Sequence, residues 1–341
     1  MSIRVLIIDD SATMRALLAA RLASEHDIEV VGTAADAAQG REAIKRLDPD
    51  VVTLDIEMPG MNGLDFLEKI MLLRPTPVII VSGSTSEGAA NTARALALGA
   101  VDCYAKSEST GGLPMDDNGK LANLVREAAQ VNFSARRGAP ARTAATTRAV
   151  LARDTKLIVI GSSTGGVEAL QVMLREFPAD CPPTMIVQHV NARFAPAIAQ
   201  TLNSESPAHV AIAEPDMPLR RGHVYLAPGD DRHMMVSGKS SFHVKLRPGE
   251  PVSGHRPSVD MLFNSAAEVC GDSAVGVLLT GMGQDGARGL FAMASTGAYT
   301  IAQDEATCTV FGMPRAAIAL GAAQVVAPLH RIARHALQKA A

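Results

Sequence analysis

The chain has 341 residues, of which 47% are hydrophobic and 20% are charged, and its formal net charge is −3. This length predicts about two domains, and this composition excludes a mostly disordered chain. No apolar stretch approaches the ~20 residues of a membrane-spanning helix, and the first residues run directly into a strand-like segment. We therefore expect a cytoplasmic protein with no signal peptide and no membrane insertion. Low aromatic content, 3%, disfavours a stacking surface for nucleic acid.

Charge is distributed unevenly along the chain. Residues 1–124 contain 11 basic and 18 acidic side chains. Residues 125–155 contain 6 basic and 2 acidic side chains, and residues 156–341 contain 15 of each kind. An acidic block, a basic connector and a neutral block predict two domains with different tasks. The apolar periodicity disappears between about residues 132 and 154, which predicts a flexible, basic linker. We expect one domain over residues 1–124, a helix end and linker over 125–153, and a second domain over 154–341.

The first block alternates strand and helix patterns. Short apolar, β-branched runs are each followed by a segment with helical periodicity, and these runs are residues 4–8, 29–33, 51–55, 78–81 and 101–106. Five strands alternating with five helices predict a doubly wound parallel sheet. Such a sheet binds its ligands at the carboxyl ends of the strands.

The second block has similar patterns. We expect strands at residues 156–160, 185–187, 224–226, 274–280 and 298–301. Helical periodicity follows residue 166, and further helices are expected near residues 314–321 and 329–337. The segment 224–226 and a hairpin-like region from 234 to 246 look less parallel than the others. The prediction is a second α/β domain with some antiparallel strands.

Polar side chains stand where four strands of the first block end. Asp9, Asp10 and Asp55 are expected to converge there, with Ser82 and Lys106 close by. Carboxylates placed together raise one another's proton affinity unless a cation neutralises them, and oxygen-only ligands suit Mg²⁺. An aspartate beside such an ion can attack phosphorus, so Asp55 is a candidate phosphoacceptor. Any one aspartate could instead cap a loop or helix.

Residues 1–124 resemble a response-regulator receiver domain, which has a flavodoxin-like (βα)5 fold. The resemblance rests on V-L-I-I-D-D-S at 5–11, D-I-E-M-P-G-M-N-G at 55–63, P-V-I-I-V-S at 77–82 and G-A-V-D-C-Y-A-K at 99–106. It implies that Asp55 accepts a phosphoryl group from a histidine kinase. Lys106 would pair with the phosphate, and Ser82 would be the switch hydroxyl. Gly83 and Ser107 depart from the usual pattern, since receiver domains usually have proline after the lysine.

The same resemblance implies a metal site. Asp10 and Asp55 would bind Mg²⁺, with Asp9 in support and the backbone of Glu57 as a further ligand. Mg²⁺ keeps several waters and leaves a position open to phosphate, which matches that expectation.

The second block contains a candidate serine hydrolase site. The run 161–165 fits G-x-S-x-G between a strand and a helix, a turn that exposes Ser163 near helix-terminal N–H groups. Such a turn could instead hold a phosphate, but G-x-G-x-x-G and a Walker lysine are both missing. His189 ends the next strand and is the candidate base, and Asp285 lies in a glycine-rich turn as the candidate orienting carboxylate. The order Ser, His, Asp disfavours a standard α/β-hydrolase.

A second group of triad residue types lies within one short segment. His255, Ser258 and Asp260 fall within six residues, and Ser258 has no flanking glycines. Residues this close in sequence seldom converge as a triad. We interpret the segment as a substrate-cleft loop or a helix cap.

Residues 154–341 resemble the catalytic domain of the chemotaxis protein-glutamate methylesterases, the CheB family. The matching runs are I-G-S-S-T-G-G at 160–166, V-Q-H at 187–189, G-H-V-Y-L-A-P-G at 222–229, H-R-P-S-V-D at 255–260 and L-T-G-M-G-Q-D-G at 279–286. The resemblance implies Ser163 as nucleophile, His189 as base and Asp285 as orienting group. The Met282 backbone, with Thr164, would help to bind the oxyanion.

The resemblance also implies substrates and partners. A glutamate γ-methyl ester on a methyl-accepting chemoreceptor would be cleaved to methanol and glutamate, and receptor glutamines would be deamidated. A chemotaxis histidine kinase would be the phosphodonor of this two-component system, and the esterase chemistry would need no cofactor. We expect a monomer whose unphosphorylated receiver blocks the cleft.

Two other functions stay open. One is a response-regulator hydrolase that acts on a different ester or amide, including a peptide bond. The other is a phosphorylation-dependent binding module with a vestigial hydrolase site, although all three triad residues are present. A DNA-binding regulator is disfavoured because the neutral second block has no basic recognition helix.

Overall fold

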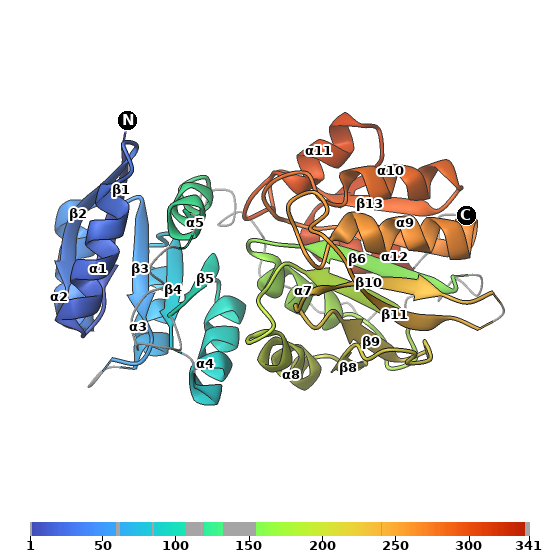
Figure 1. Ribbon diagram of the computed structural model, residues 1–341, viewed down its shortest axis with the longest axis horizontal. Helices are drawn as coiled ribbons and strands as arrows, with labels where there is room; N and C mark the ends of the chain where they lie inside the picture. Colours follow the sequence, from blue (N-terminus) through green and yellow to red (C-terminus); the bar gives the residue numbers. More distant parts are fainter. Residues whose placement is uncertain are drawn as a thin grey trace. The chain divides into compact units, whose positions relative to one another are not determined.

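The computed structural model describes residues 2–58, 62–83, 85–106, 117, 119–131, 155–239 and 241–337. The chain divides into two compact units, Met1–Phe133 and Ser134–Ala341, and each is described by itself (Figure 1). The predicted linker at 132–154 lies outside the described residues, as does Ser107. No helix among the described residues is both long and apolar enough to span a bilayer.

The first unit is a five-stranded parallel sheet with strand order β2-β1-β3-β4-β5. This confirms the predicted doubly wound fold. Its elements are β1 (Ile3–Ile8), α1 (Ala12–Ala23), β2 (Ile28–Ala34), α2 (Ala37–Leu47), β3 (Val51–Asp55), α3 (Gly63–Leu73), β4 (Val78–Ser82), α4 (Ser86–Ala97), β5 (Asp102–Ala105) and α5 (Lys120–Ala128).

The alternation of side chains along β1 assigns helices to the two faces of this sheet. Val5 and Ile7 belong to a buried cluster that includes the apolar residues of α1 and α5. Ile8 points to the other face, where a Cβ on Gly40 of α2 would lie 2.8 Å from Ile8 Cδ1 and 3.2 Å from the ring of Phe66 of α3. Helices α2 and α3 therefore pack together on the face opposite α1 and α5.

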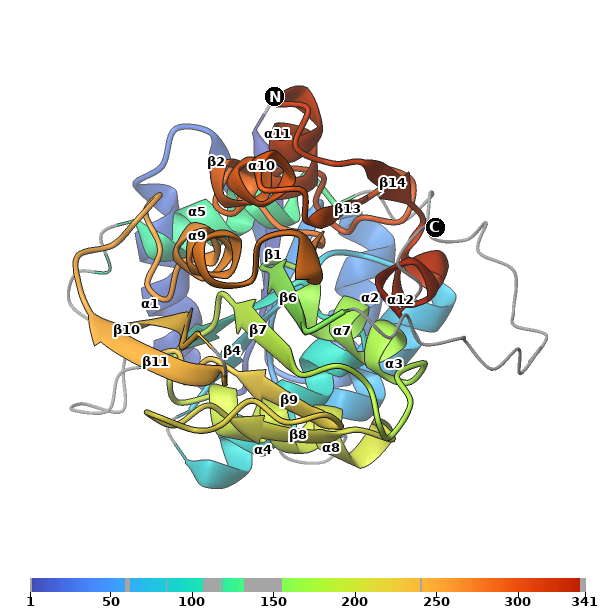
Figure 2. The same ribbon diagram turned by 90° about the vertical axis from the view of Figure 1, so that its right-hand side faces the viewer.

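The second unit has a seven-stranded sheet with strand order β14-β13-β12-β6-β7-β9-β8, and its strand pairs are parallel. A separate antiparallel hairpin, β10–β11, lies where one was predicted (Figure 2). The elements are β6 (Leu157–Ser162), α7 (Gly166–Leu174), β7 (Thr184–Gln188), α8 (Ala195–Glu205), β8 (His209–Ile212), β9 (His223–Leu226), β10 (Arg232–Ser237), β11 (His243–Pro248), α9 (Val259–Cys270), η1 (Gly271–Ser273), β12 (Ala274–Leu278), α10 (Ala287–Ser295), β13 (Tyr299–Gln303), α11 (Met313–Ala319), β14 (Val325–Ala327) and α12 (Leu329–Leu337).

The structure corrects one strand assignment. The segment 224–226 looked less parallel in the sequence, but β9 pairs in parallel with both β7 and β8. β9 lies between β7 and β8 in the sheet, and the chain passes from β7 through α8 and β8 before it reaches β9. The sequence analysis included neither α8 nor β8, so the orientation of β9 could not be inferred.

Strand positions bring the predicted catalytic segments together. β6 lies between β12 and β7, and β7 pairs with β6 in register from Ile158–Thr184 to Ser162–Gln188. The turns that follow these three neighbouring strands therefore share one edge of the sheet. On one face, β6 and β7 pack against α9, α10 and the β10–β11 hairpin through one buried apolar cluster.

Candidate functional site

Three aspartates meet at the carboxyl edge of the first sheet. Asp9 follows β1, Asp55 ends β3, and one oxygen each of Asp9, Asp10 and Asp55 lie within 4.8 Å of one another. Lys106 follows β5, and its Nζ lies 2.6 Å from Asp55 Oδ2 and 3.1 Å from Asp9 Oδ2. The structure thus places four of the predicted receiver residues together.

Burial shapes the electrostatics of this cluster. Asp9 and Asp55 are buried whereas Asp10 is exposed. Burial raises the pKa of Asp9, although the ammonium of Lys106 opposes that shift. Burial alone would lower the pKa of Lys106, but the hydrogen bonds and negative charges of Asp55 and Asp9 together outweigh burial and raise it. Three oxygen donors around one point, two of them removed from water, fit a Mg²⁺ ion.

The neighbours of Asp55 occupy defined positions. The Glu57 backbone N–H donates to Asp55 Oδ1 at 3.0 Å, which fixes the start of the following loop. The Ser82 hydroxyl donates to the Gly88 carbonyl at 3.2 Å, toward α4. A Cβ on Gly83 would lie 3.2 Å from Glu57 Oε2. The glycine at this position, where the chain departs from the usual receiver pattern, therefore leaves space for the Glu57 carboxylate.

The second site is built around the turn between β6 and α7. Gly165 has φ +75°, and a Cβ there would lie 2.3 Å from Thr309 Cβ, so only glycine fits. Ser163 precedes it by two residues and is 9% exposed. Its N–H donates to the Thr280 carbonyl at 3.0 Å, which fixes the turn to the end of β12.

His189 and Asp285 form a close pair at the same edge. His189 Nε2 lies 2.8 Å from Asp285 Oδ2, although the residues are 96 positions apart. The other ring nitrogen, Nδ1, is buried and has no hydrogen-bond partner among the described residues. An ionised Asp285 accepts a hydrogen bond from Nε2–H, so Nδ1 carries the free lone pair. The His189 N–H donates to the Ser162 carbonyl at 3.0 Å, which holds the base beside the serine turn.

The carboxylate of Asp285 lies in the N-terminus of α9. It accepts hydrogen bonds from Ser258 Oγ at 2.8 Å, the Val259 N–H at 2.7 Å and the Asp260 N–H at 3.0 Å. Burial alone would raise the pKa of Asp285, but its hydrogen bonds to His189 and to these N–H groups outweigh burial and lower it. Ser258 is also the N-cap of α9, so the helix-cap interpretation of segment 255–260 is confirmed.

The sequence analysis missed Gln188, and it named His255 without predicting its contact with His189. Gln188 is buried, and its Nε2 donates to the Ser163 carbonyl at 2.8 Å and the His189 carbonyl at 3.2 Å. The His255 ring stacks on His189 with centroids 3.8 Å apart and planes 6° apart, and burial lowers the pKa of His255 to about 4. The signal for Gln188 was a polar residue at the end of a buried strand, directly before His189.

The predicted oxyanion residues flank the serine. The Thr164 carbonyl accepts a hydrogen bond from Thr280 Oγ1 at 3.0 Å, which fixes the peptide after Ser163. A Cβ on Gly281 would lie 2.6 Å from Ser163 Cβ, so the backbone at Gly281 lies against the serine. Met282 is the next residue along the chain.

Comparison with known families covers both units. The CheB methylesterase family matches residues 158–336, and this match spans the serine turn, the histidine and the aspartate. The chain belongs to the CheB methylesterase family. The response regulator receiver domain family matches residues 5–114. The chain therefore combines a receiver domain with a CheB methylesterase domain. Receiver domains bind Mg²⁺ at their phosphorylation site, in agreement with the aspartate cluster.

Full-length relatives show the same combination. A protein-glutamate methylesterase/protein-glutamine glutaminase from Caulobacter vibrioides is 51% identical over 94% of this chain and 93% of its own length. One from Rhizobium johnstonii is 50% identical over 99% of this chain and 96% of its own length. Among solved structures, the CheB methylesterase catalytic domain of Thermotoga maritima matches with a TM-score of 0.52 and 36% identity, over 53% of this chain and 97% of that domain.

Proposed function

We propose that this CheB-family methylesterase uses Ser163, His189 and Asp285 to hydrolyse glutamate γ-methyl esters on chemoreceptors, and that it deamidates receptor glutamines at the same site. The observation that carries the proposal is the His189–Asp285 pair, whose unpartnered Nδ1 is buried at the edge that holds Ser163. The relatives' names support this substrate class.

In the acylation step, Ser163 Oγ attacks the ester carbonyl carbon while His189 Nδ1 takes the hydroxyl proton. The resulting imidazolium is stabilised by Asp285, which stays ionised and holds Nε2–H. When the tetrahedral intermediate collapses, the bond to the methoxy oxygen breaks. His189 returns its proton, and methanol leaves. An amide substrate follows the same path and releases ammonia.

Deacylation reverses these roles. A water molecule gives its proton to His189 Nδ1 and attacks the acyl carbon, the bond to Ser163 Oγ breaks, and the serine regains a proton. The products are the free enzyme and a glutamate side chain. These residues and one water account for every bond and proton of the cycle, so the proposal assigns no cofactor to the esterase.

Backbone N–H groups would bind the oxyanion formed in both steps. The N–H groups of Thr164 and Met282 are our candidates, since both residues adjoin the serine turn. The Met282 N–H donates no hydrogen bond to a described residue, which leaves it available to substrate. Donors fixed in advance in a buried site stabilise developing charge more than mobile water does.

The receiver would control this site. Asp55 would accept a phosphoryl group from a chemotaxis histidine kinase, with Mg²⁺ held by Asp9, Asp10 and Asp55 and by the backbone of Glu57. When bound, the ion would neutralise charge on the phosphoryl oxygens. Lys106 would pair with the phosphoryl group, because its Nζ already contacts Asp55.

The switch would follow from that added charge. Ser82 would turn its hydroxyl from the Gly88 carbonyl to a phosphoryl oxygen, and the changed surface would release the esterase from inhibition. The proposal places this regulation in a cytoplasmic, monomeric enzyme.

The test is methanol release from methylated receptor by the wild-type chain and by Ser163→Ala. We expect the variant to retain less than about a thousandth of the wild-type rate, because the attacking oxygen is absent. Ser204→Ala is the matched control, since this serine lies at an exposed position of α8 and its hydroxyl donates to the Thr201 carbonyl at 2.8 Å. Retained release in Ser163→Ala would contradict the triad, and ammonia release from receptor glutamines tests deamidation in the same samples.

A further inference from the structure

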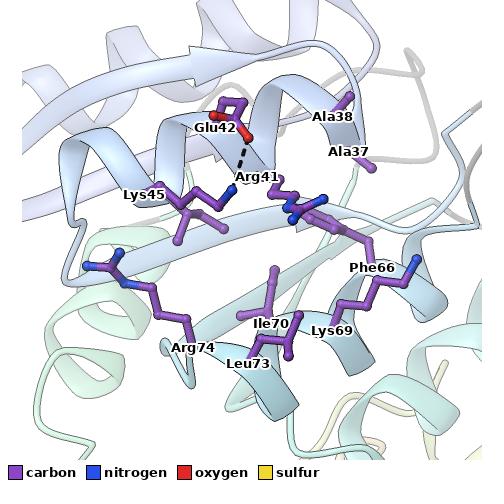
Figure 3. Close-up of a pocket in the computed structure, with 11 residues that line it drawn as sticks. Ala37, Ala38, Arg41, Glu42, Lys45, Phe66, Lys69, Ile70, Leu73 and Arg74 are labelled. Carbon is purple, nitrogen blue, oxygen red and sulfur yellow. Dashed lines mark hydrogen bonds and ion pairs between the residues drawn. The ribbon is translucent and has the colours of Figure 1, made fainter.

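The receiver carries a groove that the phosphorylation chemistry does not use. It lies between α2 and α3, has a volume of about 480 Å³, and shares no residue with the aspartate cluster (Figure 3). Its inner wall contains Ile44, Phe66 and Ile70, which pack beneath the two helices. At its mouth Leu73 is 73% exposed, so apolar surface extends from the wall to the solvent.

Basic side chains surround this groove. Arg41 and Lys45 come from α2, Lys69 comes from α3 and Arg74 caps α3, whereas Glu42 is the acidic residue of the lining. These four are over a third of the 11 basic residues in a block that has 18 acidic ones. The groove is therefore a positively charged site on a negatively charged domain.

Ion pairs within the domain offset this charge only weakly. Lys45 Nζ lies 3.2 Å from Glu42 Oε1, and Arg74 Nη2 lies 2.6 Å from Asp48 Oδ1. The side chains of both pairs are between 45% and 75% exposed. Exposed pairs contribute little stability, so an incoming carboxylate can replace the present partner at small cost.

The positions of the charges indicate what the groove would bind. Arg41 and Lys45 stand one helical turn apart, and Figure 3 shows the charged ends of Arg41, Lys69 and Arg74 at separate points around the opening. A single phosphate or carboxylate needs donors that converge on one point. Separated cations around an apolar wall instead fit several carboxylates on one chain that also presents apolar side chains.

We propose that the α2–α3 groove is a docking site for an acidic, amphipathic segment of a partner protein. One or two bulky apolar side chains of the segment would enter the groove, and its carboxylates would pair with the basic residues at the opening. A volume of 480 Å³ is within the range of sites that hold such groups. The excess of acidic residues elsewhere in this domain disfavours an anionic membrane or nucleic acid as the occupant.

The test uses the full-length chain and matched pairs of variants. Arg41→Glu reverses a charge at the groove, and Arg46→Glu makes the same change at an exposed position of α2 outside the lining. Leu73→Gln removes apolar surface at the mouth, and Leu72→Gln does so at the neighbouring residue, which is 81% exposed and does not line the groove. Thermal unfolding of each variant establishes that the receiver remains folded.

The probe is a pool of fluorescein-labelled peptides of about 12 residues, half glutamate and half leucine or phenylalanine, and binding is followed by anisotropy. We expect the wild-type chain, Arg46→Glu and Leu72→Gln to bind alike, and Arg41→Glu and Leu73→Gln to weaken binding about fivefold or more. Added salt should weaken binding. Failure of the pool to bind, or equal weakening within both pairs, would overturn the proposal. Binding to vesicles containing phosphatidylglycerol that depends on Arg41 and Leu73 would also overturn it, because the occupant would then be a membrane.

Discussion

At the scale of single residues, the carboxylate of Asp285 is held in place by groups that take no part in the bond changes of the proposed catalytic cycle. Ser258 Oγ and two backbone N–H groups donate to it, so the N-terminus of α9 keeps a buried charge in place. In the proposed triad, Ser258 would be a positioning residue that acts on His189 through Asp285.

Ser258→Ala tests this role. We expect kcat/KM for methanol release to fall roughly tenfold, because a hydrogen bond to a charged group contributes about 1.5–3 kcal/mol and the two N–H donors remain. A purely structural role would lower stability without altering the pH profile of kcat/KM. A shift of that profile, with rescue by Ser258→Thr, would therefore support positioning, and an unchanged profile would exclude it.

The same carboxylate makes stability depend on pH. The folded pKa of Asp285 lies below its ordinary value, so its stabilising contribution is present above about pH 3.9 and is lost as pH falls through the folded pKa. Ser258→Ala removes one hydrogen bond to this carboxylate, so the folded pKa of Asp285 should lie closer to its ordinary value. The difference in unfolding free energy between wild type and variant should be largest near neutral pH and should shrink below about pH 4, as urea titrations at each pH would measure.

His255 gives a pH dependence in a different range. Burial lowers its folded pKa to about 4, so the unfolded chain binds the proton more tightly and stability falls as pH falls from about 6.5 toward 4. His255→Phe keeps a ring against His189 and removes the titration. Between pH 7 and 5 the unfolding free energy of this variant should fall by about 1–2 kcal/mol less than that of wild type. His209→Phe, at an exposed position of the same unit, should follow the wild-type curve, and parallel curves for all three proteins would refute the prediction.

At the scale of elements, the serine turn shows where the backbone restricts the sequence. Gly165 and Gly321 have φ values of +75° and +69°, but a Cβ overlaps Thr309 at the first position and meets nothing within 4 Å at the second. Gly321→Ala should cost about 1–2 kcal/mol for its φ alone. Gly165→Ala should cost roughly 1–3 kcal/mol more because of the overlap, and it should also slow methanol release. Equal stability of the two variants in urea unfolding would contradict this account.

The sequence predicts elements best where one local pattern determines them. β1 and β6 were identified because short apolar runs end at polar turns, and the turn glycines marked Ser163. The orientation of β9 and the hydrogen bonds of Gln188 and Ser258 depend on partners brought together by the fold; Ser258 and Asp285 are 27 residues apart. Composition and spacing carry no information about such contacts, which explains why segment 255–260 was interpreted as a cleft loop or a helix cap, while the contact of Ser258 with Asp285 was not predicted.

At the scale of the whole molecule, an acidic receiver and a neutral esterase domain share one chain, and each has its reactive groups at the carboxyl edge of its own parallel sheet. In the proposed function, phosphorylation would add charge to the first edge, whereas hydrolysis would take place at the second. Control of one by the other requires two states of the chain that differ in esterase activity.

Removal of the receiver tests for those states. If the unphosphorylated receiver inhibits the esterase, deletion of residues 1–150 should raise basal methanol release by roughly 5- to 150-fold, the usual range of coupling between sites. Addition of a small phosphodonor with Mg²⁺ should raise the rate of the full-length chain and leave the truncated chain unchanged. Asp55→Asn should hold the full-length chain at its basal rate, whereas Asp65→Asn, at an exposed position of α3, should respond like wild type. A truncated chain no faster than the unphosphorylated full-length chain would show that the receiver does not inhibit. Activation by the phosphodonor would then require a direct contribution of the phosphorylated receiver to receptor binding.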